Sequence, residues 1–311
     1  MGKLAFVFPG QGSQSVGMGK ELAEKFPEAR AVFDEADAAL AEKLSALCFE
    51  GPEDAQKLTR NTQPAILATS AAAHAVLAKR APKPDYVAGH SLGEYSALTA
   101  MGALSVGDAV KSVRARGTFM QEAVPEGQGA MAAILGLEPA QVRLACEAAM
   151  QGQVVAPANY NSPEQTVIAG HAGAVERAMA KCKELGAKRA LPLPVSAPFH
   201  CALMAPVQPR LREVLSQISW KAPAAPVVVN VEARPNSDPE RAVNLLIDQV
   251  VAPVRWIECV QMMAEDGVTR IVEVGPGKVL GGLVKRINKG VEVFNVEDEA
   301  SLTKTLAALG A

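Results

Sequence analysis

The chain has 311 residues, of which 49% are hydrophobic and 21% are charged, and its formal net charge at pH 7 is −2. This length and composition predict a globular protein with one large α/β domain and room for an inserted smaller one. The near-neutral charge argues against a nucleic-acid binder, which presents a basic face, and no apolar run is long enough to cross a membrane.

Short apolar runs and amphipathic stretches alternate along most of the chain. Strands are predicted at residues 4–8, 86–88 and 270–274. Helices are predicted at residues 19–26, 27–47, 64–79, 106–124 and 255–265. Because each predicted strand is a continuous apolar run, as in a parallel sheet covered on both faces, the large body of the protein is expected to be α/β.

A G-x-S-x-G pentapeptide, Gly89-His90-Ser91-Leu92-Gly93, follows the second predicted strand and precedes a helical stretch. This pattern is typical of the nucleophile elbow of α/β-hydrolase-like domains, a sharp turn that lifts a serine hydroxyl off the backbone. The serine then lies at a helix N-terminus, where amide groups and the helix dipole favour the negative charge that develops in acyl transfer. An ordinary tight strand-to-helix connection is the alternative.

One segment departs from the α/β alternation. Strands are predicted at 130–136, 154–158, 165–169 and 188–192, and helices at 139–150 and 172–185. The order βαββαβ is that of a ferredoxin-like α+β unit, and Pro- and Gly-rich segments flank it. We therefore predict a small domain at residues 126–193, inserted into a large domain formed by residues 1–125 and 194–311. The crevice between the two is a favoured place for a ligand.

A serine nucleophile needs a base, and the four histidines are unequal candidates. His74 falls inside an alanine-rich helix, His171 lies at a strand-to-helix junction, and the side chain of His90 is expected to diverge from that of Ser91. His200 follows the second domain boundary in a Pro-bounded loop, residues 196–200, that can hold it over the crevice. By elimination, His200 is the predicted base.

The remaining reactive patterns predict no cofactor. The five cysteines are scattered and never spaced C-x-x-C, which indicates free thiols in a reducing cytoplasm and not a zinc site. Ser15 stands where a dinucleotide fingerprint needs glycine, and Val279 stands where a P-loop needs Ser or Thr. Cys201, adjacent to His200, leaves a Cys–His pair as a minor alternative.

Further motifs accompany the pentapeptide in a fixed order. They are Gly10-Gln11-Gly12-Ser13-Gln14, Thr62-Gln63-Pro64-Ala65, Arg116, Asn159-x-Asn161-Ser162-Pro163, Pro198-Phe199-His200 and Glu273-Val274-Gly275-Pro276-Gly277. The set resembles the malonyl-CoA:acyl carrier protein transacylases of fatty acid synthesis, and the resemblance runs from about residue 4 to residue 300.

The resemblance implies roles for several positions. Ser91 takes the malonyl group as an ester, His200 is the base, and the backbone carbonyl of Gln249 orients the imidazole. The backbone amides of Gln11 and Leu92 form the oxyanion hole. The other expected pocket residues are Gln63, His90, Asn159, Asn161 and Phe199.

Arg116 decides the substrate class. It follows Val113 by three positions in the predicted helix 106–124 and so borders the buried face of that helix. From the helix pattern alone, a snorkelling arginine at the surface is the common interpretation. The resemblance favours a bidentate clamp on the free carboxylate of malonate. It also assigns residues 197–200, with Phe199, to the malonyl-type pattern, in contrast to a methylmalonyl type with serine there.

The implied reaction is ping-pong transfer from malonyl-CoA to Ser91 and then to the phosphopantetheine thiol of acyl carrier protein, without metal or other cofactor. Lys188, Arg189, Lys285 and Arg286 are candidate docking residues for that acidic partner, although scattered solubilising charge explains them equally well. Two rivals remain: a serine esterase or thioesterase on a related fold, and a non-catalytic docking subunit of a synthase complex.

Overall fold

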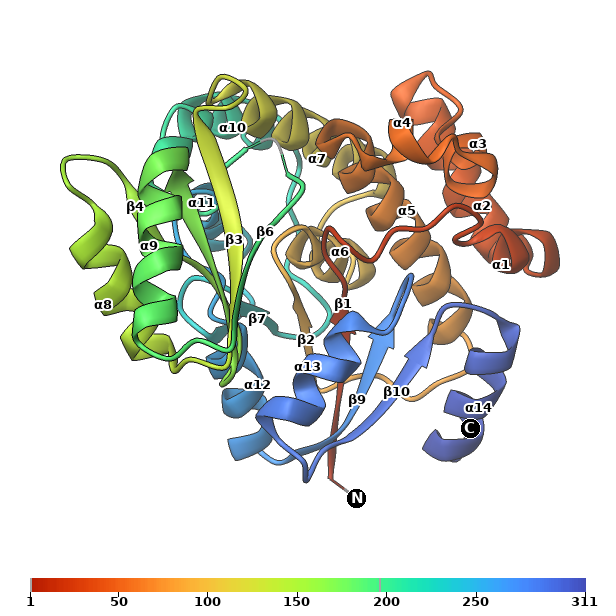
Figure 1. Ribbon diagram of the computed structural model, residues 1–311. Coiled ribbons are helices and arrows are strands. Elements are labelled where there is room, and N and C mark those ends of the chain that lie inside the picture. The colour runs from red at the N-terminus through yellow and green to blue at the C-terminus, as the bar shows by residue number, and fades with distance from the viewer. Residues whose placement is uncertain (1, 196) are drawn as a thin grey trace.

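The computed structural model describes residues 2–195 and 197–311, so Met1 and Ser196, the first residue of the predicted loop 196–200, lie outside the described residues (Figure 1). A six-stranded sheet with the order β10-β9-β1-β2-β7-β8 forms the large body. Its strands are β1 (Lys3–Phe8), β2 (Tyr86–Gly89), β7 (Val227–Val229), β8 (Arg234–Asn236), β9 (Val268–Val274) and β10 (Glu292–Val296). All neighbouring pairs are parallel except β7 and β8, so the expected α/β body is confirmed.

Helices cover both faces of this sheet. They are α1 (Lys20–Lys25), α2 (Pro27–Leu40), α3 (Leu44–Glu50), α4 (Glu53–Lys57), α5 (Thr59–Ala78), α6 (Leu92–Ala100), α7 (Val106–Glu122), α10 (Val207–Leu215), α11 (Pro239–Gln249), α12 (Trp256–Glu265), α13 (Val279–Ile287) and α14 (Glu299–Leu309). Along β1, Phe6 and Phe8 join the core under α5 and α6, whereas Ala5 and Val7 join the core under α12 and α13. The two cores explain why β1 is a continuous apolar run.

Two helix predictions in the N-terminal third were wrong at their boundaries. The helix expected at 27–47 is two helices, because Ala41 has a left-handed φ of 52° that ends α2. The side chain of Asp37 then accepts hydrogen bonds from Ser45 N at 2.8 Å and Ser45 Oγ at 2.7 Å, which fixes the start of α3. The helix expected at 64–79 begins at Thr59, because the first helical turn forms before Pro64: Asn61 N and Thr62 N both donate to Leu58 O.

A separate four-stranded antiparallel sheet carries the predicted small unit. Its order is β4-β5-β3-β6, from β3 (Gly129–Leu135), β4 (Val155–Ser162), β5 (Gln165–His171) and β6 (Arg189–Pro192), with α8 (Pro139–Ala149) and α9 (Ala172–Glu184) between them. Figure 1 shows these two helices on the outer side of the sheet. Ala132 and Ile134 pack under the helices, whereas Met131 and Ala133 of the same strand pack into the core of the large body.

Strand β4 connects the small sheet to the large body. It continues four residues beyond its expected end at residue 158, where it still pairs with β5 and where Asn159 also pairs with Val254 of the large body. Tyr160 N donates to Val254 O at 2.9 Å, and Val254 N donates to Ala158 O at 2.8 Å.

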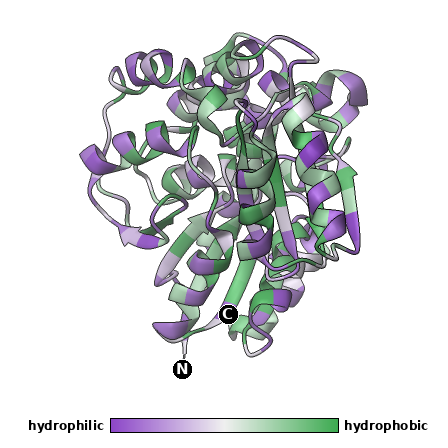
Figure 2. Ribbon diagram, turned by 60° about the vertical axis from the view of Figure 1, so that its left-hand side comes forward, coloured by the Kyte–Doolittle hydropathy of each residue, from purple (hydrophilic) through white to green (hydrophobic). Residues whose placement is uncertain are grey.

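In Figure 2 hydrophobic residues gather along the strands, and hydrophilic residues face outward on the surrounding helices. Among the helices of the described residues, none combines the length and apolar character of a membrane span.

Candidate active site

The predicted elbow connects β2 to α6, and its two glycines are sterically required. A Cβ on Gly89 would lie 1.8 Å from the carbonyl carbon of Gly93, and a Cβ on Gly93 would lie 2.0 Å from Phe8 O. Ser91 has φ 52° and ψ −105°, a conformation that L-residues rarely adopt. Such strain persists only where surrounding contacts hold it, and it is typical of functional sites.

Asn230, at the carboxyl end of β7, hydrogen-bonds through its side chain to the backbone of the elbow. Its Oδ1 accepts from Ser91 N at 2.7 Å, and its Nδ2 donates to Gly89 O at 2.7 Å. The sequence prediction missed this residue. The signal was the short apolar run of β7 ending in a polar residue, because side chains that follow parallel strands meet at the carboxyl edge of the sheet.

The structure brings Ser91, His200 and Gln249 into one chain of hydrogen bonds. Ser91 Oγ and His200 Nε2 lie 2.7 Å apart, and His200 Nδ1 lies 2.8 Å from the backbone oxygen of Gln249. A carbonyl oxygen only accepts, so Nδ1 carries the proton and Nε2 is free to accept from the serine hydroxyl. Burial, with the nearby charge of Arg116, lowers the pKa of His200 from 6.5 to about 3. The imidazole is therefore neutral and competent as a base.

Arg116 lies deeper than its helix position suggested. Its side chain is 1% exposed, so it does not snorkel to the surface. Nη1 donates to Gln63 Oε1 at 2.8 Å, and Nη2 donates to Gln249 Oε1 and to Ser91 Oγ, each at 3.0 Å. Burial lowers the pKa of Arg116. These partners are neutral amides and a hydroxyl, and Arg116 Nε is buried without a hydrogen-bond partner among the described atoms. A buried cation with such partners favours an incoming anion.

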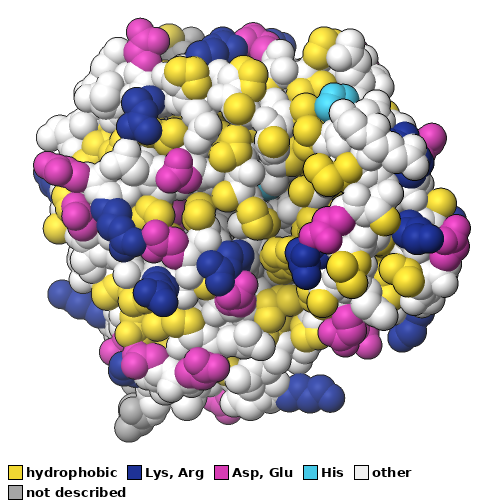
Figure 3. Space-filling model, turned by 90° about the vertical axis from the view of Figure 1, so that its left-hand side faces the viewer, with side chains coloured by type: hydrophobic (Ala, Val, Ile, Leu, Met, Phe, Trp, Pro, Cys, Tyr) yellow, Lys and Arg dark blue, Asp and Glu magenta, His cyan; other side chains and the backbone are white. Residues whose placement is uncertain are grey.

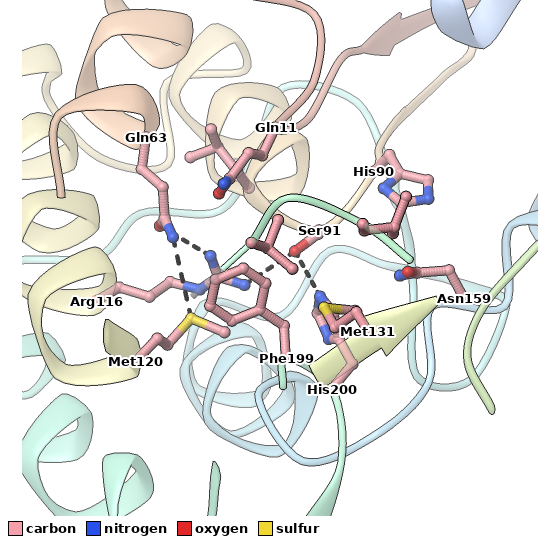
Figure 4. A pocket seen from close by; sticks show the side chains of 13 residues that line it. Gln11, Gln63, His90, Ser91, Arg116, Met120, Met131, Asn159, Phe199 and His200 are labelled. Atoms are coloured by element: carbon pink, nitrogen blue, oxygen red, sulfur yellow. Dashed lines mark hydrogen bonds between the residues drawn. The ribbon is translucent and has the colours of Figure 1, made fainter. Parts of the chain in front are cut away.

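These groups surround a cavity of about 120 Å³ (Figure 4). Figure 4 shows Arg116 and His200 both pointing toward Ser91. The predicted residues that line the cavity are Gln11, Gln63, His90, Ser91, Leu92, Arg116, Asn159, Phe199 and His200. Sequence reasoning missed its apolar lining by Met120, Met131, Leu193 and Val195, which carry no motif.

Asn161 was expected in the pocket but does not line this cavity. Residues two apart in a regular strand share a face, yet the register of β4 shifts near both Asn159 and Asn161. Asn161 instead contacts His90, whose Nε2 donates to Asn161 Oδ1 at 2.8 Å. The side chain of His90 diverges from Ser91, as expected, and Asn161 fixes its orientation.

The other candidate bases and nucleophiles lie elsewhere. His74 packs against the rings of Phe6 and Phe8, and His171 Nδ1 accepts from Val154 N at 2.9 Å. Burial raises the pKa of Cys201 to about 11, so its thiol is not an activated nucleophile. Within the described residues, no three His, Cys, Asp or Glu side chains form a group that could hold a metal ion.

Comparison with known proteins shows which family and which relatives this chain matches. Residues 5–305 match the family model described as acyl transferase domain. The malonyl CoA-acyl carrier protein transacylase of Escherichia coli K12 is 53% identical over 288 residues, covering 92% of this chain and 93% of that protein. The protein of the same name from Bacillus subtilis is 48% identical over 310 residues, covering 99% and 98%.

Two solved structures are also similar over nearly the whole chain. An acyl carrier protein S-malonyltransferase from Vibrio cholerae has a TM-score of 0.96 and 50% identity, covering 97% of this chain and 99% of that one. A malonyl-transacylase solved in complex with a type II polyketide synthase acyl-carrier protein has a TM-score of 0.96 and 48% identity, covering 98% and 99%.

Proposed function

This chain belongs to the acyl transferase domain family, and from that premise we propose that it transfers a malonyl group from malonyl-CoA to the phosphopantetheine thiol of acyl carrier protein. The expected resemblance to the malonyl-CoA:acyl carrier protein transacylases is confirmed by relatives that are 48% to 53% identical over most of the chain. The observation that carries the substrate assignment is a fully buried arginine 3.0 Å from the serine hydroxyl oxygen.

The first half-reaction forms a seryl ester. Ser91 Oγ attacks the thioester carbonyl carbon while His200 Nε2 takes the hydroxyl proton. Leu92 and Gln11 line the cavity, and in this proposal their backbone amides stabilise the negative carbonyl oxygen. The carbon–sulfur bond then breaks, and the CoA thiolate leaves with the proton from His200.

The second half-reaction repeats these steps with the acceptor thiol. His200 takes the thiol proton, the sulfur attacks the ester carbonyl, and Ser91 Oγ regains the proton as it leaves. One thioester replaces another, so the overall equilibrium lies near unity. The chain supplies nucleophile, base, oxyanion donors and cation from its own residues, and we propose that no metal or other cofactor takes part.

Arg116 gives the site its preference for a dicarboxylic acyl group. Malonyl and acetyl thioesters share the reacting carbonyl, so a remote contact must distinguish them. A guanidinium donates two parallel hydrogen bonds to a carboxylate, whereas an acetyl group leaves the buried cation without an anion. That difference is worth about 2–5 kcal/mol, or roughly 30- to several thousand-fold in rate.

A serine esterase or thioesterase has the same Ser91 and His200 requirement and is the alternative. Six of the cavity-lining residues are apolar, namely Leu92, Met120, Met131, Leu193, Val195 and Phe199, and this lining disfavours water beside the ester. A non-catalytic docking subunit is disfavoured because it has no use for a serine 2.7 Å from a neutral imidazole.

We propose the finer description of the molecule on the same basis. The large body is an α/β-hydrolase-like domain of residues 1–125 and 194–311, and residues 126–193 form a ferredoxin-like insert. The five free, buried cysteines fit a cytoplasmic enzyme.

Figure 3 shows the face over α8 and α9 with Lys and Arg interspersed among Asp and Glu. Carrier-protein docking at Lys188, Arg189, Lys285 or Arg286 therefore needs local complementarity, not a uniform basic patch.

Intact-mass measurement after incubation with malonyl-CoA tests the proposal. The protein should gain one malonyl group, keep it in buffer, and lose it when a pantetheine thiol is added. Ser91→Ala should abolish the gain because the nucleophile is gone. Ser96→Ala, which changes a buried serine within α6, is the matched control and should keep it. Rapid release of free malonate without a thiol would identify a hydrolase.

A further inference from the structure

One buried carboxyl group outside the cavity lining contacts the residues that hold the site. Glu94 lies in the first turn of α6 and is 1% exposed. Its Oε2 accepts two hydrogen bonds, from Asn230 N at 2.8 Å and from Gln249 Nε2 at 3.0 Å. No step of the proposed transfer uses this side chain, and a carboxyl group buried this deeply requires an explanation.

Gln249 connects Glu94 to both the base and the cation. Its backbone oxygen accepts from His200 Nδ1 at 2.8 Å, and its side-chain Oε1 accepts from Arg116 Nη2 at 3.0 Å. Its Nε2 also donates to Ser91 O at 3.1 Å. An amide side chain can turn over and exchange its oxygen and nitrogen. If Gln249 did so, its NH₂ group would face the donors of Arg116. The acceptors around Nε2, of which Glu94 Oε2 at 3.0 Å is the nearest, therefore keep the amide in the orientation that Arg116 needs.

Asn230 connects Glu94 to the nucleophile. Its backbone N–H is held by Glu94, while its side chain clamps Ser91 N and Gly89 O at 2.7 Å each. The Ser91 N–H is thereby occupied in the free enzyme. This leaves the backbone amide of Leu92, a residue that lines the cavity, as the elbow donor for the oxyanion.

We propose that Glu94 is a positioning residue for malonyl transfer: its Oε2 atom fixes Asn230 and Gln249, and through them the nucleophile, the base and the cation. The proposal rests on the proposed function. The role of Glu94 requires a hydrogen-bond acceptor at the Oε2 position and does not require a negative charge there. Burial raises the pKa of Glu94 to about 7, and Oε2 accepts in either protonation state because the proton can reside on Oε1.

The test compares Glu94→Ala with Glu94→Gln in single-turnover malonylation of Ser91, followed by intact mass. Glu94→Ala should acylate about 100-fold more slowly, the scale of a loss caused by misplaced catalytic groups. Glu94→Gln should stay within about threefold of the wild type. Its carbonyl oxygen replaces Oε2, and the fixed Asn230 N–H sets the orientation of the new amide.

Glu273→Ala is the matched control. Glu273 is also fully buried and accepts from Leu280 N at 3.0 Å and Gly281 N at 2.7 Å, but it does not line the cavity. Its loss should lower the melting temperature while the acylation rate stays within about threefold. A merely structural role for Glu94 predicts the same behaviour for Glu94→Ala.

The proposal is overturned if folded Glu94→Ala acylates at the wild-type rate, or if Glu94→Gln is as slow as Glu94→Ala. Should Glu94→Ala not fold, Gln249→Met decides, because it removes the amide and keeps the backbone carbonyl. It should raise the KM for malonyl-CoA about tenfold and that for acetyl-CoA far less; equal changes overturn the proposal. Failure of the wild type itself to take up malonyl would refute the function instead.

Discussion

Arg116 distinguishes this site from a plain serine–histidine pair, because its guanidinium touches the nucleophile itself. The side chain reaches Ser91 Oγ, Gln63 and Gln249 with two of its nitrogens. Gln63 and Gln249 hold the cation in place without neutralising it, since amide oxygens accept hydrogen bonds but carry no charge. We therefore expect the substrate carboxylate to meet a preorganised positive charge.

Arg116→Ala should reduce malonyl transfer by roughly 30- to several thousand-fold and acetyl transfer far less, because only malonyl loses an ion pair. Steady-state kcat/KM with malonyl-CoA and acetyl-CoA measures both. Arg114→Ala is the control on the same helix, since Arg114 pairs with Glu42 away from the cavity. Equal losses for the two substrates would make Arg116 a structural residue.

The burial of His200 sets the pH dependence of acylation. Its pKa is lowered to about 3, so the imidazole stays neutral between pH 5 and pH 8. The folded protein then binds fewer protons at this residue than the unfolded chain, and His200 costs stability as the pH falls below 6.5 towards 3. Single-turnover acylation should show no loss of rate between pH 8 and pH 5. A break near pH 6.5 would show that the histidine is solvated.

Among the elements, the strand-to-helix crossing at the elbow was the most predictable feature. The pentapeptide marked the turn because no residue with a Cβ fits at Gly89 or Gly93. The short strands β7, β8 and β10 were not predicted, and β7 places Asn230 beside Ser91. Strands β7 and β8 have only three residues each, which is too little periodicity to be recognised, so their long-range contacts decide them.

Gly93→Ala tests the crossing. The added methyl carbon would lie 2.0 Å from Phe8 O, so β1 and α6 must separate, and the cost should be on the order of 4 kcal/mol of unfolding free energy. Gly282→Ala in α13 is the control, because nothing lies within 4 Å of its Cβ and alanine favours a helix. Chemical denaturation measures both variants. A Gly93→Ala protein as stable as the wild type would contradict the close packing.

At the scale of the whole molecule, the sequence predicted two units but not how they are joined. Ser91 and Arg116 precede the small sheet along the chain, and His200 and Gln249 follow it. The pentapeptide predicted the serine and elimination among the histidines predicted the base, whereas only the family resemblance predicted a role for Arg116. Asn230 and the apolar cavity lining depend on contacts between distant segments, and no local pattern marks them.

The shared core predicts a single unfolding transition. Met131 and Ala133 of the small sheet belong to the same hydrophobic core as Phe6 and Phe8, and Val254 pairs with β4. The two units should therefore melt together, with a calorimetric enthalpy equal to the van't Hoff enthalpy. Differential scanning calorimetry measures both enthalpies. Two resolved transitions would show that the insert is an independent domain.

The 3.0 Å contact between Arg116 Nη2 and Ser91 Oγ has one more consequence. The ester linkage and the far end of its acyl group must both fit within reach of one guanidinium. The position of Arg116 should thus limit the length of the acyl group that the site accepts. We therefore expect a diacid of three carbons to be preferred over one with a further methylene, which moves the terminal carboxylate away from the guanidinium. The same side chain would then select the acyl group by both its length and its negative charge.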